Sequence, residues 1–379
     1  MPDFLRYATQ KQAEIVRLIG RLAGCESPSD RPEAVDRFTA LLAREAAGFA
    51  TAQFFPGGDF AKHLRLEFDL PGRAKSGQIL VLGHADTVWP LGTLETMPFR
   101  EADGRLWGPG VLDMKAGLAF CLFAVRALRD LDVAVQRKVV LLVVSDEEVG
   151  SPSSRALTEA EARQSDCVLV LEPGTGLSGK LKTARKGVGH YTITVNGKAS
   201  HAGVDFESGA SAIVEAARQV IAVAGFTDLA RGITVNPGVI QGGTRSNVIA
   251  AEARVEVDVR VTRLADAEQL DRKFRALAPA DARCAIRVEG GLNRPPMERT
   301  AAIGELFEQA REIGARMGVV VEESATGGGS DGNFTAALGV PTLDGLGAVG
   351  EGAHAANESI LVDRIADRVT LLAGLLAST

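Results

Sequence analysis

The spacing of hydrophobic residues changes along the chain and separates it into segments of different character. In the first part, two amphipathic helical patterns are followed by strands that become increasingly apolar. The predicted helices are 3–24, 31–47 and 116–128, and the predicted strands are 62–70, 78–83, 137–144 and 167–171. The last two strands are continuous apolar runs, which is typical of parallel strands buried on both faces of a sheet. Between residues 86 and 112 the sequence is rich in Gly and Pro, which predicts an irregular connection.

From about residue 180, apolar and polar residues alternate, which indicates strands with one exposed face. The predicted strands here are 189–196, 232–240, 248–261 and 283–289, and the predicted helices are 208–223 and 265–277. Their order along the chain is β-α-β-β-α-β, the split βαβ pattern. After about residue 293 the first pattern returns, with helices at 300–316 and 360–376 and strands at 318–322 and 340–343.

These patterns predict an α/β fold with a mixed, mostly parallel sheet flanked by helices. We expect residues 1–179 and 293–379 to form this domain, and residues 180–292 to form an inserted α+β domain. The open face or edge of the sheet in the inserted domain is a surface on which two copies of the chain can pair. A homodimer through this domain is therefore expected.

The composition excludes several classes of protein. The 379 residues contain 42 Lys and Arg against 48 Asp and Glu, a net charge of −6, so the chain lacks the basic surface of a nucleic-acid-binding protein. It has no apolar run of about 18 residues, so no membrane span is expected. The four cysteines lack metal-ligand spacing, and the first residues lack the pattern of a secretory signal. Reduced thiols in the cytoplasm are therefore expected.

Acidic residues and a histidine directly follow three of the predicted apolar strands. His84 and Asp86 come after the first of these strands, Glu147 and Glu148 after the second, and Glu172 after the third. Ligands of open α/β sheets bind beyond the carboxyl ends of the strands. We therefore expect these side chains to meet in one crevice.

Two further candidates lie in loops that contain glycine. Asp113 stands directly before a buried helix, and His354 lies in a loop near the end of the chain. The complete set of two His, one Asp and two Glu suits a pair of divalent cations, since imidazole favours zinc and carboxylates can bridge. The other histidines in the first domain and at the start of the inserted one, His63 and His190, are more simply interpreted as structural.

The paired glutamates predict two different chemical roles, a cation ligand and a proton acceptor. One carboxylate of a Glu147-Glu148 pair can bind a cation while its neighbour accepts a proton from water. Asp86, two residues after His84, can accept the second N–H of that imidazole and so orient it.

Several motifs then resemble a known family. They are Gly-His-Ala-Asp-Thr-Val (83–88), Gly-Val-Leu-Asp-Met-Lys-Ala-Gly (110–117), Asp-Glu-Glu-Val-Gly (146–150), Leu-Glu-Pro (171–173), Ala-Ser-His-Ala-Gly (199–203) and the late His354. In this order and spacing they resemble the zinc-dependent aminoacylase/carboxypeptidase family, which includes acetylornithine deacetylase, succinyl-diaminopimelate desuccinylase and glutamate carboxypeptidase. The resemblance covers essentially the whole chain and implies the co-catalytic zinc peptidase fold.

The resemblance also implies roles for individual residues. His84 and Glu172 would bind one zinc ion, Glu148 and His354 would bind the other, and Asp113 would bridge them. Glu147 would be the general base and Asp86 would orient His84. The Asp113–Met114 peptide bond would be cis. The inserted domain would mediate dimerisation and act as a lid. Its His201 would reach the active site of the other subunit and polarise the scissile carbonyl there. Cobalt or manganese can replace zinc at sites of this composition.

Within the family, several segments favour the glutamate carboxypeptidase branch. They are 326–332, 343–347 and Leu-Asn-Arg-Pro-Pro at 292–296. This branch implies that Arg294 pairs with the α-carboxylate of the substrate, and that Asn247 and Arg260 also face the substrate. The substrate would be a small N-acyl or peptidyl amino acid. Deacylation of an N-acylamino acid, as in the acetylornithine deacetylase branch, remains an alternative.

Three other interpretations are weaker. Gly-Gly-Ser-Asp-Gly at 328–332 matches the G-x-S-x-G of serine hydrolases, but no strand leads directly into Ser330. The G-x-G-x-x-G match at 345–350 is not followed by a complete βαβ unit. A relative without catalytic activity, acting as a metal-free binding protein, would have lost a ligand or the base, whereas every expected position is filled here.

Overall fold

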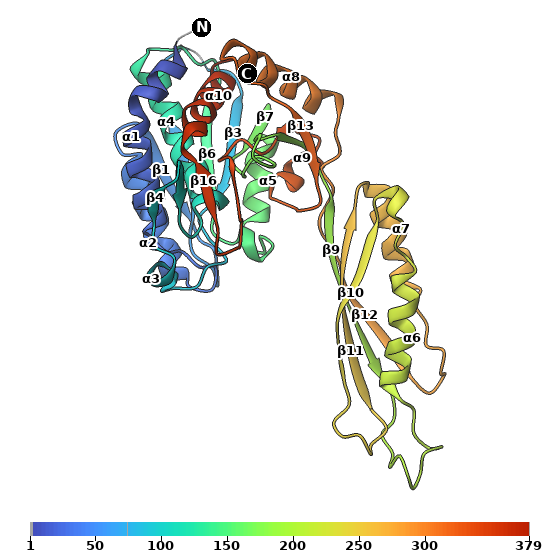
Figure 1. The fold of residues 1–379 in the computed structure, drawn as a ribbon. Helices are drawn as coiled ribbons and strands as arrows, with labels where there is room; N and C mark the ends of the chain where they lie inside the picture. Colours follow the sequence, from blue (N-terminus) through green and yellow to red (C-terminus); the bar gives the residue numbers. More distant parts are fainter. Residues whose placement is uncertain (1–2, 74, 379) are drawn as a thin grey trace. The chain divides into compact units, whose positions relative to one another are not determined.

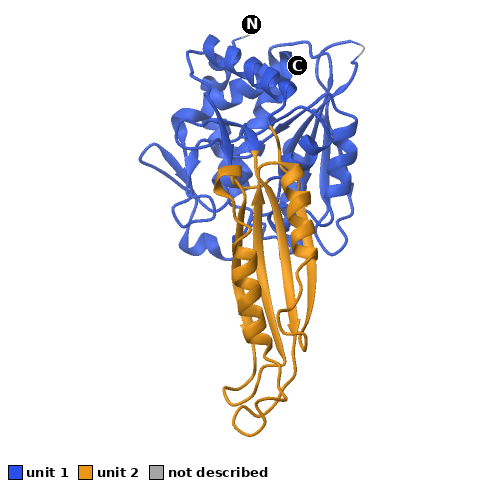
Figure 2. Ribbon diagram, turned by 90° about the vertical axis from the view of Figure 1, so that its right-hand side faces the viewer, with its two compact units in different colours: residues 1–184, 299–326, 330–379 blue, residues 185–298, 327–329 orange. Residues whose placement is uncertain are grey.

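The computed structural model describes residues 3–73 and 75–378 and divides the chain into two compact units. Unit 1 comprises residues 1–184, 299–326 and 330–379, and unit 2 comprises residues 185–298 and 327–329 (Figure 2). Unit 2 begins and ends a few residues later than the domain expected at 180–292. It also takes the Gly327–Gly329 segment, which the sequence pattern places in the other domain, because Arg185 donates hydrogen bonds to the carbonyl oxygens of Gly328 and Gly329.

Unit 1 is built on a six-stranded sheet in the order β1-β2-β6-β3-β7-β14 (Figure 1). Its strands are β1 (Ala50–Phe55), β2 (His63–Phe68), β3 (Gln78–His84), β6 (Lys138–Val144), β7 (Cys167–Val170) and β14 (Thr342–Leu343). Strands β6, β3, β7 and β14 are mutually parallel. At one edge of the sheet, β2 runs antiparallel to β6, and β1 runs antiparallel to β2. The predicted mixed, mostly parallel sheet flanked by helices is confirmed.

Helices cover both faces of this sheet. The helices of unit 1 are α1 (Phe4–Ala23), α2 (Pro32–Glu45), α3 (Thr93–Thr96), α4 (Ala116–Asp130), α5 (Arg155–Arg163), α8 (Ala301–Arg316), α9 (Gly332–Ala337) and α10 (Ile365–Ser378). The short helix α3 has no buried residue and is not part of this cover. Side chains of β6 alternate between two hydrophobic clusters: Leu141 belongs to the cluster that includes residues of α1, α4 and α10, and Leu142 belongs to the cluster that includes residues of α5. This double burial explains why the sequence of β6 is apolar throughout.

Short strands form two smaller sheets in unit 1. One has the order β15-β16-β5-β4, with β4 (Arg100–Ala102), β5 (Arg105–Trp107), β15 (Gly350–Glu351) and β16 (Ser359–Leu361). The other pairs β8 (Leu181–Arg185) with β13 (Glu323–Thr326). The first of these sheets brings the connection after β3 beside the loop near the C-terminus, two segments that are far apart in the sequence.

Unit 2 contains a four-stranded antiparallel sheet in the order β10-β11-β9-β12 with two helices. Its elements are β9 (Gly187–Asn196), α6 (Ala212–Ala224), β10 (Thr234–Gly242), β11 (Glu252–Val261), α7 (Leu264–Arg275) and β12 (Ala285–Arg294). Buried residues of α6 and α7 share one hydrophobic cluster with the sheet, so the helices pack on the same face. The element order is the expected β-α-β-β-α-β.

Several predicted boundaries are wrong for local reasons. Residues 318–322, which the structure describes, do not form the expected strand, and β13 forms instead at Glu323–Thr326. The last helix begins at Ile365 because Ser359–Leu361 pairs with β5. Helix α6 begins at Ala212 because the side chain of Ser211 caps it by accepting a hydrogen bond from the Val214 N–H.

Among the described residues, no helix has both the length and the apolar character needed to cross a membrane.

Candidate active site

The carboxyl ends of three neighbouring parallel strands form the floor of the candidate site. His84 is the last residue of β3, the turn of Glu147–Val149 follows β6, and Glu172 follows β7. The parallel pairing of β3 with both β6 and β7 places these three ends at the same edge of the sheet. The loops that carry Asp113 and His354 add their side chains at this edge.

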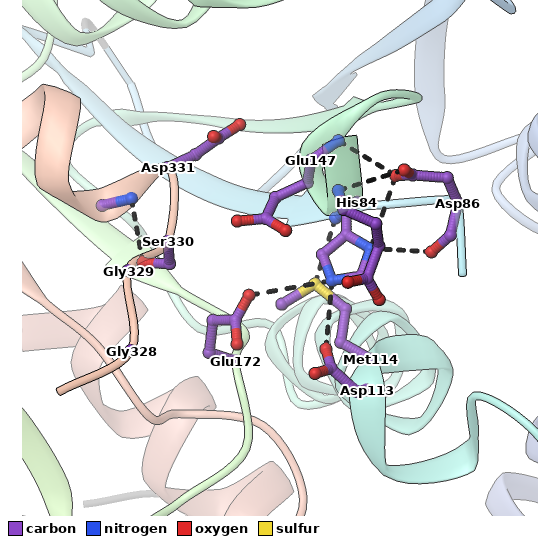
Figure 3. A network of polar contacts seen from close by, with 12 residues as sticks. His84, Asp86, Asp113, Met114, Glu147, Glu172, Gly328, Gly329, Ser330 and Asp331 are labelled. Carbon is purple, nitrogen blue, oxygen red and sulfur yellow. Dashed lines mark hydrogen bonds and ion pairs between the residues drawn. The ribbon is translucent and has the colours of Figure 1, made fainter. Parts of the chain in front are cut away.

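Two groups of three side chains share Asp113. In the first, His84 Nε2 lies 3.1 Å from Asp113 Oδ1 and 3.7 Å from Glu172 Oε1 (Figure 3). In the second, His354 Nε2 lies 3.4 Å from Asp113 Oδ2 and 3.2 Å from Glu148 Oε2. Within each group, the possible ligand atoms all lie within 4.8 Å of one another. The two oxygens of Asp113 therefore face different histidines, which is the arrangement that a bridging carboxylate requires.

The Asp113 loop connects β5 to the buried helix α4. Gly110, at its start, has a φ of 70°, a left-handed conformation that glycine adopts without a steric cost. The peptide bond between Asp113 and Met114 is cis, as the family resemblance implied. The Met114 sulfur lies 3.0 Å from the backbone nitrogen of His84, so this loop contacts the end of β3 directly (Figure 3).

The orientation of His84 is set by a backbone group. Its Nδ1 lies 2.9 Å from the backbone oxygen of Asp86, which can only accept a hydrogen bond, so Nδ1 is the donor. The carboxylate that the sequence analysis expected in this role lies farther away, at 3.6 Å. This tautomer directs Nε2 toward Asp113 and Glu172, where a cation would bind.

The carboxylate of Asp86 instead holds the glutamate turn. It accepts hydrogen bonds from the backbone N–H groups of Glu147 at 3.2 Å and Glu148 at 3.1 Å. It also accepts a hydrogen bond of 2.7 Å from the Ser29 hydroxyl. Asp86 therefore acts on both sides of the site: its carbonyl orients His84, and its side chain positions Glu147 and Glu148.

The charges and the burial of the site shift the pKa values of four predicted ligands, His84, Asp113, Glu148 and His354. The hydrogen bonds to Asp113 and Glu148 raise the pKa of His354 to about 10. Burial lowers the pKa of His84, but the hydrogen-bonded Asp113 and the neighbouring carboxylates outweigh burial and raise that pKa well above its usual value. Burial raises the pKa of Asp113, but the bonded imidazoles of His354 and His84 outweigh it and hold the pKa well below its usual range.

Burial dominates at Glu148 and Asp86, raising the pKa of Glu148 and raising that of Asp86 to about 7. Without a cation, the negative charge of the site is therefore offset by protons on the two histidines. A metal ion must displace these protons, because only a neutral imidazole binds it.

Two observations fit the binding of a cation by the group of Asp113, Glu148 and His354. Glu148 Oε1 is buried and has no hydrogen-bond partner among the described residues, which is costly for a carboxylate oxygen unless an ion binds it. His354 has a φ of 62°, a left-handed conformation that is uncommon for a residue with a side chain. Such a conformation at a candidate ligand is typical of functional sites, where the surrounding structure enforces it.

The four remaining predicted residues belong to unit 2 and form two pairs within it. The backbone N–H of Ala202 donates to Asn247, and His201 forms a bridge with Val248, so His201 and Asn247 are near neighbours. Arg260 and Arg294 stand on the two strands that flank β9, and both pair with Val188.

These two pairs are at opposite ends of β9. The Arg pair is opposite Val188, whereas His201 and Asn247 lie in loops beyond the end of the strand at Asn196. At roughly 3.3 Å per residue, the eight residues from Val188 to Asn196 span about 26 Å. In one chain the two pairs therefore cannot contact the same small molecule.

The weaker interpretations do not match the contacts. The Ser330 hydroxyl is buried and donates to Asp344, while His354 pairs with Asp113 and Glu148. The carbonyl oxygens of Gly345 and Gly347 accept hydrogen bonds from Arg368, a contact with no relation to phosphate binding.

The two histidines interpreted as structural differ in their surroundings. His63 is buried among serines, with Nδ1 3.0 Å from Ser145 Oγ and Nε2 3.2 Å from Ser153 Oγ. His190 is exposed on β9, opposite Asp258 of β11.

The sequence analysis missed Ser29 and Asp146. Asp146 accepts hydrogen bonds from the backbone N–H groups of Ser153 and Ser154 and so closes the turn after the glutamate pair. Ser29 is 57 positions from Asp86, so spacing carries no signal for it. Asp146 is adjacent to the pair and could have been found as the Asp that precedes a helical turn.

Comparison with known proteins gives a family and relatives. The sequence description of Peptidase family M20/M25/M40 matches residues 80–378. Carboxypeptidase G2 from Pseudomonas sp. (strain RS-16) is 30% identical over 360 residues, which cover 92% of this chain and 84% of the relative.

Solved structures with the same fold span nearly the whole chain. Aminopeptidase PepT from Bacillus cereus ATCC 10987 superposes with a TM-score of 0.80 at 22% identity, covering 97% of this chain and 98% of the other. The Bacillus subtilis YXEP protein, a dinuclear metal-binding peptidase, superposes with a TM-score of 0.68 at 15% identity, covering 97% of this chain and 98% of the other.

Proposed function

The chain belongs to Peptidase family M20/M25/M40 and is a metallopeptidase, and we propose that it uses two bound zinc ions to hydrolyse the amide bond of an N-acyl or peptidyl amino acid. In this proposal the enzyme releases glutamate from the C-terminal end of its substrate. The likeness to carboxypeptidase G2 supports a carboxypeptidase, and the choice of glutamate rests on the segments that resemble the glutamate carboxypeptidase branch. The observation that carries the proposal is the sharing of Asp113 between the His84–Glu172 and Glu148–His354 groups. One carboxylate that faces two imidazoles provides for two cations rather than one.

The proposed ligand sets follow these groups. His84 and Glu172 hold one zinc ion, Glu148 and His354 hold the other, and Asp113 bridges them. When bound, the ions supply Lewis acidity for the scissile carbonyl and for the attacking water. Cobalt or manganese can occupy the same mixture of imidazole and carboxylate ligands.

Glu147 is the proposed general base. The Asp86 carboxylate fixes the turn that carries Glu147 and Glu148. Glu148 is a cation ligand in this proposal, whereas Glu147 lies beside the cations and does not bind them. It accepts a proton from the attacking water and passes it to the amide nitrogen as the C–N bond breaks.

The substrate carboxylate is assigned to unit 2. Arg294 is only 5% exposed and lies on β12 beside the Gly327–Gly329 segment. A planar guanidinium binds a carboxylate through two parallel hydrogen bonds, which is the recognition that a free α-carboxylate needs. Arg260, whose Nη1 lies 3.4 Å from the Gly327 oxygen, is the proposed second contact. Deacylation of an N-acylamino acid uses the same carboxylate and differs in the acyl group.

We also propose that the enzyme is a homodimer through unit 2, which then serves as the dimerisation and lid domain. The separation of His201 and Asn247 from the two arginines means that a second copy must supply one pair if all four residues contact one substrate. Helix α6 and the edge strand β10 expose apolar side chains, which suits an interface between copies. They are Ile213, Val214, Ile221, Val239 and Ile240.

The four cysteines form no disulfide, consistent with the proposed cytoplasmic location.

Replacing Glu147 with Gln should reduce kcat by about two orders of magnitude or more, because the amide keeps the shape but cannot accept the proton. Zinc content and thermal stability should stay at wild-type levels. The matched control is Glu95→Gln, on the exposed helix α3, which should be fully active. Activity of Glu147→Gln within threefold of wild type would contradict its role as the base.

Replacing Arg294 with Lys should raise KM for an acyl-glutamate by about tenfold or more, because lysine keeps the charge but loses the planar fork. The control Arg287→Lys lies on the same strand with a side chain that is 68% exposed, and it should behave as wild type. A substrate amidated at the α-carboxylate should be poor for the wild type and little affected by Arg294→Lys. Equal cleavage of the free acid and the amide by the wild type would remove the carboxypeptidase assignment and leave the two-cation site intact.

Sedimentation equilibrium should give twice the chain mass of 39.8 kDa. Ile221→Asp places a charge on an α6 side chain that is 76% exposed, and should yield inactive monomers. Val320→Asp, at an 81% exposed side chain of unit 1, is the control and should remain dimeric. A fully active monomer would contradict both the dimer and the role of His201 in the second copy.

A further inference from the structure

Glu358 is a buried carboxylate that the proposed chemistry does not use. It lies directly before β16, four positions after His354, and its exposed fraction is 0%. A buried carboxylate that is neither a ligand nor a base requires a compensating set of donors.

Four N–H groups supply this compensation. Glu358 Oε1 accepts from the backbone nitrogens of Leu112 at 2.9 Å and Asp113 at 3.1 Å. Glu358 Oε2 accepts from the backbone nitrogen of Gly110 at 2.8 Å and from Trp89 Nε1 at 2.7 Å. Both oxygens are therefore used as acceptors, and every donor is a neutral N–H.

The donors belong to segments that carry cation ligands. Gly110 and Leu112 precede Asp113 in the same loop, and the N–H of Asp113 is itself one of the donors. Trp89 lies in the loop that leaves β3 after His84. The backbone N–H of Glu358 donates to Ala355, the residue after His354, so the carboxylate is also tied to the His354 loop.

We propose that Glu358 is a positioning residue for the cation site, whose carboxylate holds the His84, Asp113 and His354 segments in one arrangement before a cation binds. This inference rests on the proposed two-cation function. It explains how His354 can keep a left-handed backbone conformation in a loop that is otherwise exposed. It also explains how the two oxygens of Asp113 stay directed at different histidines, since the backbone N–H of Asp113 is held by the Glu358 carboxylate.

A carboxylate is required because all four partners are donors. Glutamine has nearly the same shape, but its amide nitrogen must face either the Leu112 and Asp113 pair or the Gly110 and Trp89 pair. Donors would then oppose donors, and buried N–H groups would be left without an acceptor, which destabilises this arrangement. The loops should relieve this conflict by moving apart, which disturbs the ligands they carry.

The experiment measures Co²⁺ binding to Glu358→Gln by competition with a chromophoric chelator, together with the visible absorption spectrum of the bound ion. We expect affinity to fall by about 10–100-fold, as for other changes to groups that orient metal ligands. We expect an altered spectrum and a lower kcat at saturating metal, with KM little changed, since substrate contacts are untouched.

Two further variants separate positioning from a general loss of stability. Glu351→Gln, on β15 with a side chain that is 50% exposed, is the matched control and should bind Co²⁺ like the wild type. Trp89→Phe removes one of the four donors and keeps an aromatic ring, so it should lower affinity in the same direction by a smaller factor. If Glu358→Gln does not fold, Trp89→Phe decides the question.

Folded Glu358→Gln, or Trp89→Phe where that variant decides, with wild-type Co²⁺ affinity and spectrum would overturn the inference. A wild-type protein that binds fewer than two equivalents of Co²⁺ would instead overturn the proposed two-cation function. The two failures are therefore distinguishable.

Discussion

The repulsion between carboxylates gathered at one edge of a parallel sheet is the constraint on which the rest of this structure depends. Five acidic side chains lie there: Asp86, Asp113, Glu147, Glu148 and Glu172. Two like charges about 4 Å apart repel by about 4 kcal/mol in a medium of effective dielectric constant 20. The fold offsets this cost with the imidazoles of His84 and His354, and in our account with two cations as well.

The sheet provides the rigidity that this arrangement needs. Strands β3, β6 and β7 are buried on both faces, so their ends cannot shift without disturbing two hydrophobic clusters. The proposed ligands outside the strands lack this support and depend on hydrogen bonds to polar side chains. Asp86 fixes the glutamate turn, and Glu358 contacts the loops of Asp113 and His354. Buried polar groups therefore position the parts of the site that packing does not.

This division explains how much could be predicted from the sequence. The position of His84, Glu148 and Glu172 at one edge of the sheet could be predicted because an apolar run followed by a ligand-type residue marks the end of a buried strand. The sheet type followed from the same runs. The role of the Asp86 carbonyl, the contact of Ser29 and the donors around Glu358 were not found, because they join residues distant in sequence. The inclusion of Gly327–Gly329 in unit 2 likewise depends on Arg185, far away along the chain.

Anomalous X-ray diffraction from crystals of the zinc-loaded enzyme, recorded on both sides of the zinc absorption edge, tests the central claim most directly. The account predicts two peaks, one in contact with His84 and Glu172 and the other with Glu148 and His354, with one oxygen of Asp113 bound to each. A single peak, or two peaks of which only one contacts Asp113, would contradict it.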